Sequence, residues 1–105
     1  MIPTKKIMYQ IFSILSNEDN IRVLNFLLDT PLKINDLIKK MNEPFNKIQK
    51  QLDILEKNHF IKKRFVENKH VRNLEYFITE RTAVLLEKLN LILNQYISQS
   101  KSNEN

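Results

Sequence analysis

The sequence contains no cysteine and no glycine, and it has only three prolines. Without cysteine the chain has no thiolate nucleophile or thiol redox switch, and it forms neither a zinc finger nor an iron–sulfur cluster. Without glycine it lacks the phosphate-binding loops of P-loop and dinucleotide-binding enzymes and the nucleophile elbow of hydrolases. These enzyme classes are therefore excluded.

Long hydrophobic runs are also missing. The apolar stretches are interrupted by Lys, Asn or Asp, so none reaches the roughly 18 residues that cross a membrane. The first 16 residues show no cleavage-site pattern of a signal peptide. With 105 residues, 42% of them hydrophobic, the chain fits one domain around a single core. We expect one cytoplasmic domain over residues 1–97 and a disordered polar tail over residues 98–105.

Positive charge is concentrated in one third of the chain. The formal net charge is +5, and residues 39–72 contain ten basic but only four acidic side chains. A codon bias explains why lysine is preferred to arginine, but it does not explain why the excess lies in one segment. The distribution favours a polyanionic partner.

Periodicity and turn signals predict four helices in the first 58 residues. Apolar residues at helical spacing predict a helix over 5–15, and Ser16 or Asn17 caps a second helix that ends near residue 29, before Pro31. A short third helix is expected over 34–41. Pro44 is suited to the first position of a fourth helix over 44–58.

The pattern changes after residue 58. Two strands are expected over 60–66 and 71–78, joined by a turn at 67–70, and Thr79 caps a last helix that runs to about residue 97. The predicted fold is mainly α with a small β-hairpin. The order of its elements, about five helices plus a two-stranded wing, is that of a winged helix-turn-helix.

Three segments carry motifs with a common resemblance. Residues 15–27 (LSNEDNIRVLNFL) place a leucine and a polar cap before an Arg-aliphatic-x-Leu helix, and residues 48–56 (IQKQLDILE) end in Leu-x-aliphatic-Leu. Residues 74–80 (LEYFITE) hold a Glu-Tyr pair before an aliphatic-Thr-Glu helix start. Together they resemble bacterial and archaeal winged-helix transcription regulators of the ArsR and HxlR types. The resemblance covers about residues 7–97 and implies a DNA-binding regulator whose first and last helices form a homodimer.

The sequence departs from that family at two kinds of position. The cysteines that bind metal or sense oxidants in such regulators have no counterpart here. The usual glycine between recognition helix and wing is replaced by Asn58 and His59, of which Asn58 is expected to take the left-handed conformation.

The exposed face of the fourth helix is expected to read DNA. On the opposite face, Phe45 and Ile48 are expected to point into the core with Leu52 and Leu55. Lysine amines can reach phosphates or guanine edges, and side-chain amides match adenine in the major groove. The predicted contacts are Asn46, Lys47, Gln49, Lys50 and Gln51 on the recognition helix and Lys62, Lys63, Arg64, Lys69, His70 and Arg72 on the wing. The alternative is that these side chains only solvate a surface.

The first and last helices carry more apolar residues than one buried stripe needs. We expect them to pair across a two-fold axis and build a homodimer. The predicted contacts are Ile7, Ile11, Leu85, Leu89, Ile92 and Tyr96. The alternative is that the two helices cover each other within one chain.

No arrangement of residues indicates catalysis. His59 and His70 are the only histidines, so we expect no metal site, no cofactor and no enzyme activity. The expected function is a nucleoid-associated, sequence-specific regulator of transcription that binds double-stranded DNA as a homodimeric repressor, without a membrane partner; no effector is identified. The alternatives are a winged-helix protein-interaction module and a plasmid- or replication-associated DNA-binding protein.

Overall fold

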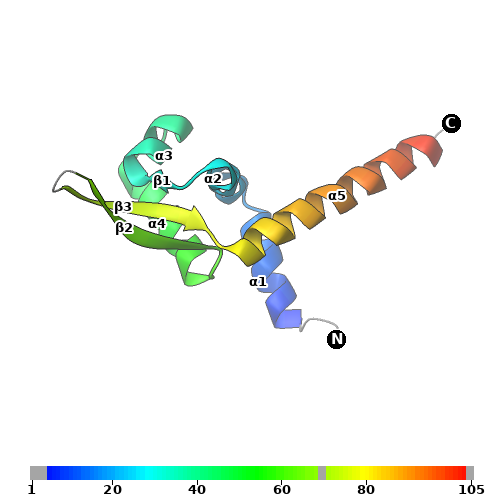
Figure 1. Ribbon diagram of the computed structural model, residues 1–105. Helices are drawn as coiled ribbons and strands as arrows, with labels where there is room; N and C mark the ends of the chain where they lie inside the picture. Colours follow the sequence, from blue (N-terminus) through cyan, green and yellow to red (C-terminus); the bar gives the residue numbers. More distant parts are fainter. Residues whose placement is uncertain (1–4, 69–70, 104–105) are drawn as a thin grey trace.

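The computed structural model describes residues 5–68 and 71–103 (Figure 1). These residues form five helices and three strands, in the order that the sequence predicts except for one short strand. The elements are α1 (Lys5–Leu15), α2 (Glu18–Asp29), β1 (Leu32–Lys33), α3 (Ile34–Met41), α4 (Phe45–Lys57), β2 (Ile61–Asn68), β3 (Val71–Ile78) and α5 (Glu80–Asn103). The winged helix-turn-helix fold is confirmed. In the described part of the chain, no helix has the length and apolar character to span a membrane.

Helix α2 begins and ends at the predicted signals. The Asn17 side chain caps it by accepting a hydrogen bond of 3.1 Å from the backbone N–H of Asn20. Glu18 and Asp19 follow in the first turn, where the helix dipole stabilises negative charge. Thr30, the residue before proline, is extended, so the helix stops there.

The turn of the helix-turn-helix joins α3 to α4. The C-cap of α3 is Asn42, in the left-handed conformation (φ 53°, ψ 47°), which asparagine tolerates better than most residues. Pro44 precedes α4 with an extended backbone (φ −68°, ψ 155°). At the other end of α3, the Asp36 carboxylate accepts a hydrogen bond of 3.2 Å from the backbone N–H of Lys33.

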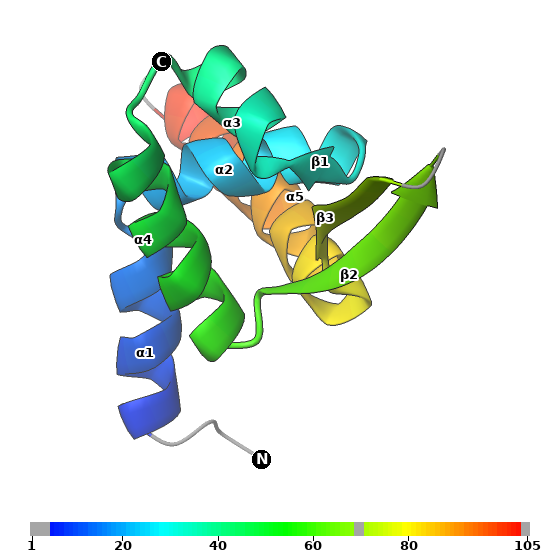
Figure 2. The same cartoon turned by 90° about the vertical axis from the view of Figure 1, so that its left-hand side faces the viewer.

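The wing is an antiparallel hairpin. Strands β2 and β3 pair from Ile61 opposite Ile78 to Asn68 opposite Val71, so the turn is shorter than the predicted residues 67–70. Figure 2 shows β2 starting at the end of α4 and running away from that helix. The sheet has three strands, not the predicted two, because β1 pairs with the other edge of β3. Two residues are too few to show strand periodicity in a sequence.

The junction between α4 and the wing differs from the prediction. Asn58 is not left-handed (φ −93°); His59 is (φ 64°). The N–H of His59 bonds to the carbonyl of Glu56 and the N–H of Phe60 to that of Leu55, at 3.0 and 2.9 Å. This is a Schellman motif, which places positive φ on the residue after the C-cap. Asn58 is the C-cap itself, so the left-handed position falls on His59.

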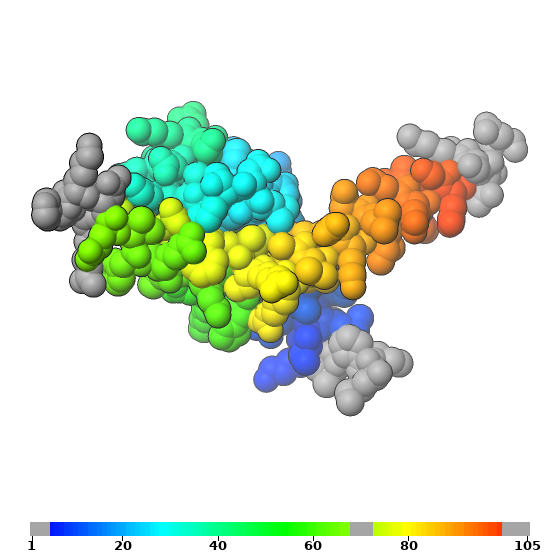
Figure 3. Space-filling view, viewed as in Figure 1, coloured from blue at the N-terminus to red at the C-terminus, as the bar shows by residue number. Residues whose placement is uncertain are grey.

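Helix α5 is longer than predicted and extends away from the domain (Figure 3). It continues to Asn103, so the expectation of a disordered tail from residue 98 is wrong up to that residue. No proline or glycine follows residue 97 to end the helix. The radius of gyration is 16.4 Å, against about 13 Å for a compact chain of this length. The excess reflects the projecting helix.

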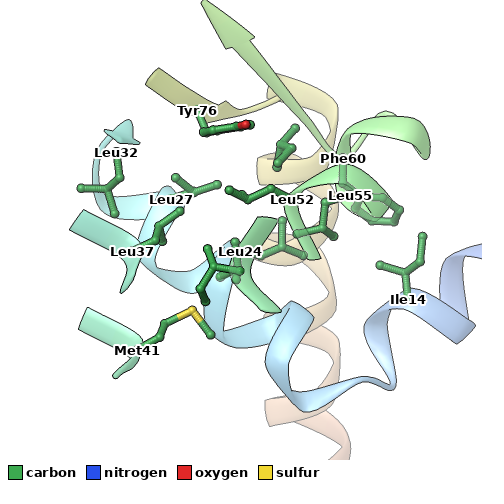
Figure 4. Close-up of a cluster of buried hydrophobic side chains, with 13 residues drawn as sticks. Ile14, Leu24, Leu27, Leu32, Leu37, Met41, Leu52, Leu55, Phe60 and Tyr76 are labelled. Atoms are coloured by element: carbon green, nitrogen blue, oxygen red, sulfur yellow. The ribbon is translucent and has the colours of Figure 1, made fainter. Parts of the chain in front are cut away.

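One hydrophobic core holds these elements together (Figure 4). Leu24 and Leu27 from α2 pack with Leu52 and Leu55 from α4 and with Tyr76 from β3. The remaining buried apolar side chains are Ile14, Val23, Leu32, Leu37, Met41, Ile48, Phe60 and Ile61. Because α4 contributes its Ile48, Leu52 and Leu55 side to this core, its opposite side faces solvent.

Candidate nucleic-acid interface

The outward face of α4 presents part of the predicted recognition set. Asn46, Lys50 and Lys57 are exposed opposite the buried side of the helix. Among the residues that the structure describes, none forms a side-chain hydrogen bond or ion pair with Asn46 or Lys50. These two side chains are therefore available to a partner along the first two turns of α4.

Two residues of α4 lie on the unexpected side of the boundary between core and solvent. Gln51 is only 8% exposed, so the prediction that it contacts DNA is wrong. It lies one residue before Leu52 and three after Ile48, at the edge of the buried side. Its Oε1 has no hydrogen-bond partner among the described residues. Phe45, expected in the core, is instead 52% exposed.

Lys47 is exposed but engaged by two carboxylates. Its Nζ lies 3.0 Å from Glu43 Oε1 and 3.4 Å from Asp19 Oδ2. The hydrogen bond to Glu43, together with the Asp19 carboxylate, raises the pKa of Lys47, so the amine stays charged at neutral pH. These contacts tie the start of α4 to the start of α2. Lys47 is thus placed to position the recognition helix rather than to read bases.

Gln49 is also engaged within the helix. Its Nε2 donates a hydrogen bond of 2.9 Å to Asp53 Oδ1, one turn further along α4. Reading adenine needs both the donor and the acceptor of the amide. Gln49 would therefore have to break this bond before it could read adenine.

On the wing, two of the predicted basic residues are paired with acids. Lys63 Nζ lies 3.2 Å from Glu56 Oε1, and this hydrogen bond raises the pKa of Lys63. Arg64 lies opposite Glu75 in the hairpin register and donates to it at 2.8 Å, with its guanidinium 4.9 Å from the centre of the Phe77 ring. The first pair joins β2 to α4, and the second joins the two strands.

The remaining wing residues have different standings. Lys62 is exposed, and no acidic residue in the described part of the chain pairs with it. Arg72 is placed by its backbone alone, opposite Glu67 in the register. Lys69 and His70 lie outside the described residues. The wing therefore offers Lys62 as its clearest available cation.

The predicted site omits two exposed lysines, Lys39 and Lys40, in the last turn of α3. Lys40 Nζ lies 5.7 Å from the centre of the Phe26 ring. Their place in the basic segment 39–72 was the signal that could have included them. The turn after α3 brings that helix end close to the start of α4.

The predicted dimer residues fall into two groups. Ile11, Leu85 and Leu89 are half-buried within the chain, whereas Ile92 and Tyr96 are 57% and 67% exposed. Every residue from 90 to 99 is exposed. Ile7 is partly exposed beside a cavity of about 380 Å³ between α1 and the start of α5. The alternative that α1 and α5 cover each other within one chain does not hold for the second half of α5.

The described residues hold no group of three His, Cys, Asp or Glu side chains that could bind a metal ion. His59 is exposed at the junction between α4 and the wing. His70 lies outside the described residues.

No protein-family model matches this sequence, and no curated protein matches it either. Solved structures do match its fold. It is similar to Rv0081 of M. tuberculosis, with a TM-score of 0.79 and 20% identity over 95% of this chain and 98% of that one. It is also similar to the reduced form of the transcriptional regulator YodB from B. subtilis, with a TM-score of 0.77 and 18% identity over 93% and 94% of the two chains.

A third similar structure is the homodimeric winged helix-turn-helix DNA-binding domain of Mb0332 from Mycobacterium bovis, described as a possible ArsR-family regulator. Its TM-score is 0.74, with 13% identity over 88% of this chain and 82% of that one. A regulator of the MarR family from Enterococcus faecalis shares the fold as well, so the likeness does not single out the ArsR or HxlR type. At these identities, the structural neighbours establish the fold.

Proposed function

We propose that this protein is a sequence-specific regulator of transcription that binds double-stranded DNA as a homodimer and represses by occluding its site. The observation that carries the proposal is the helix-turn-helix whose second helix presents Asn46 and Lys50 opposite the core. The structural neighbours, which are winged-helix transcriptional regulators, support it.

In this proposal α4 enters the major groove with its first two turns. Residues near the start of a recognition helix contact base edges, where Lys50 matches the O6 and N7 acceptors of guanine and Asn46 matches adenine. Lys62 and Arg72 belong to the hairpin that leaves the end of α4, so they would contact the flanking phosphates. Phosphate contacts position the protein and base contacts select the sequence.

The proposed partner of α5 is the α5 of a second copy. Leu85, Leu89, Ile92 and Tyr96 recur at spacings of four, three and four residues, which is the apolar repeat of paired helices. The stripe grows more exposed toward its C-terminal end, so a single chain leaves it uncovered. The homodimeric state of the Mb0332 domain supports the same arrangement here.

A two-fold dimer would present two α4 helices to one side of a duplex. Its site would be palindromic, with half-sites about one helical turn, or roughly 34–36 Å, apart. A dimer over such a site blocks other proteins from the same DNA without needing another surface, which is why we propose repression.

A second candidate is a winged-helix module that binds a protein instead of DNA. The ion pairs of Lys47, Lys63 and Arg64 favour it, because each places a carboxylate on the surface that would face phosphates. The proposed regulator therefore depends on the cations that the structure leaves without an acidic partner, chiefly Lys50 and Lys62.

The test is selection of bound sequences from a pool of random duplexes. We expect the wild-type protein to enrich a palindrome. Lys50→Ala should lose preference at one base pair of each half-site, whereas Lys57→Ala, an exposed lysine in the last turn of the same helix, should keep the whole preference. Absence of any enrichment would contradict the regulator and favour the protein-interaction module.

A further inference from the structure

Phe45 is a large apolar side chain placed where a recognition helix meets DNA. It is the first residue of α4, it is 52% exposed, and it does not belong to the buried core cluster. The core side of α4 is made by Ile48, Leu52 and Leu55, and the domain does not extend far enough to cover the ring at the start of the helix. Phe45 therefore has half of its surface free for a partner.

Polar side chains surround this ring on the outward face. Asn46 is its neighbour in sequence, and Gln49 and Lys50 follow one turn later on the same side of the helix start. Asn46 and Lys50 are the two residues that remain available for base edges. An apolar group thus lies beside the two polar groups to which the proposed function assigns sequence reading.

We propose that Phe45 contacts the C5-methyl group of a thymine, so that the protein reads thymine through its methyl group. The inference rests on the proposed function, because it assumes that α4 enters the major groove. Among the four bases, thymine alone presents an apolar group there, and phenylalanine is one of the side chains that contact it. A thymine is therefore part of the half-site that Asn46 and Lys50 help to define.

The methyl group can be removed from the DNA without changing its hydrogen-bonding groups. Uracil lacks only this methyl, so each thymine of the selected duplex is replaced in turn by deoxyuridine and the affinity is measured by fluorescence anisotropy. We expect a loss of about fourfold at one thymine in each half-site, which corresponds to one buried methyl group. At the other thymines the replacement should change affinity little.

The protein side of the experiment uses Phe45→Ala with a matched control. Phe45→Ala should bind the thymine and uracil duplexes equally, because the contact that distinguishes them is gone. The control is Phe65→Ala, which removes an equally large ring, 64% exposed on β2, and should keep the wild-type preference for thymine. Circular dichroism confirms that both variants remain folded.

The outcomes separate this inference from the proposed function. If the wild-type protein selects no sequence, the proposed function is wrong and the inference is wrong with it. If it selects a sequence but no uracil replacement weakens binding, the inference alone is overturned. The same holds if Phe45→Ala keeps the wild-type preference for thymine over uracil.

Discussion

Replacing Ile92 with glutamate separates assembly of the proposed dimer from folding of the chain. In one chain Ile92 is 57% exposed, and its neighbours from residue 90 to 99 are exposed as well. A carboxylate at this position stays in water, so the monomer is expected to fold. In the proposed dimer the same carboxylate lies within the stripe that the second α5 covers. Leu89 is a poorer choice because it is half-buried within its own chain.

The expected effect on the dimer is large. Complete burial of an isoleucine side chain contributes about 1.5–3 kcal/mol, so burying the exposed half of Ile92 contributes roughly 2–3 kcal/mol over the two chains. Two buried, unpaired carboxylates cost at least about 3 kcal/mol more. Together these effects amount to about 6 kcal/mol, which raises the dissociation constant of the dimer on the order of 10⁴-fold.

Sedimentation velocity at micromolar concentration measures the outcome. The wild-type chain should sediment as a dimer and Ile92→Glu as a folded monomer with unchanged circular dichroism. Leu91→Glu is the matched control, because Leu91 is 58% exposed but lies off the apolar stripe of α5. It should remain a dimer. A monomeric wild type, or two variants with the same mass, would refute the proposed use of this stripe.

Three further predictions concern the recognition helix, the core and metals. Asn46→Ala should lower discrimination between the selected and scrambled duplexes by about 1–3 kcal/mol, whereas Lys62→Ala should weaken binding to both and reduce the salt slope by about one; identical behaviour in titrations at several salt concentrations would refute this division. Gln51→Met should raise stability by about 1–3 kcal/mol in thermal melts, because it removes a buried acceptor without a partner, and should leave DNA discrimination unchanged; a lower melting temperature would contradict this. Zinc should change neither the melting temperature nor DNA affinity, and a stoichiometric site detected by calorimetry would overturn that expectation.

Most helix boundaries could be predicted because they depend on neighbouring residues. The cap at Asn17, the extended Thr30 before Pro31, and Pro44 before α4 each act within one turn of the chain. The order of helices and strands then follows. The end of α5 could not be predicted in this way, because no residue after Ile97 forces the helix to stop.

The details of the candidate site depend on residues that are distant in sequence. Lys47 pairs with Asp19 of another helix, and Lys63 of the wing pairs with Glu56 of α4. No local pattern shows that such a lysine is engaged, so the sequence treats all exposed lysines alike. Strand β1 likewise forms only because β3 offers it an edge.

Gln51 and Phe45 show a second limit of sequence reasoning. Both lie at the edge of the buried side of α4, where helical spacing alone does not decide between core and solvent. Packing of the neighbouring elements buries Gln51, whereas Phe45 lies beyond the reach of the core at the first residue of the helix.

The measurement that tests the central claim most directly is the ratio of two affinities. The wild-type protein is titrated by fluorescence anisotropy into the selected duplex and into a scrambled duplex of the same composition, at one physiological salt concentration. The account predicts that the selected duplex binds at least about 10³-fold more tightly, as specific regulators do. A ratio near one would show that the exposed face of α4 reads no sequence and would contradict the account.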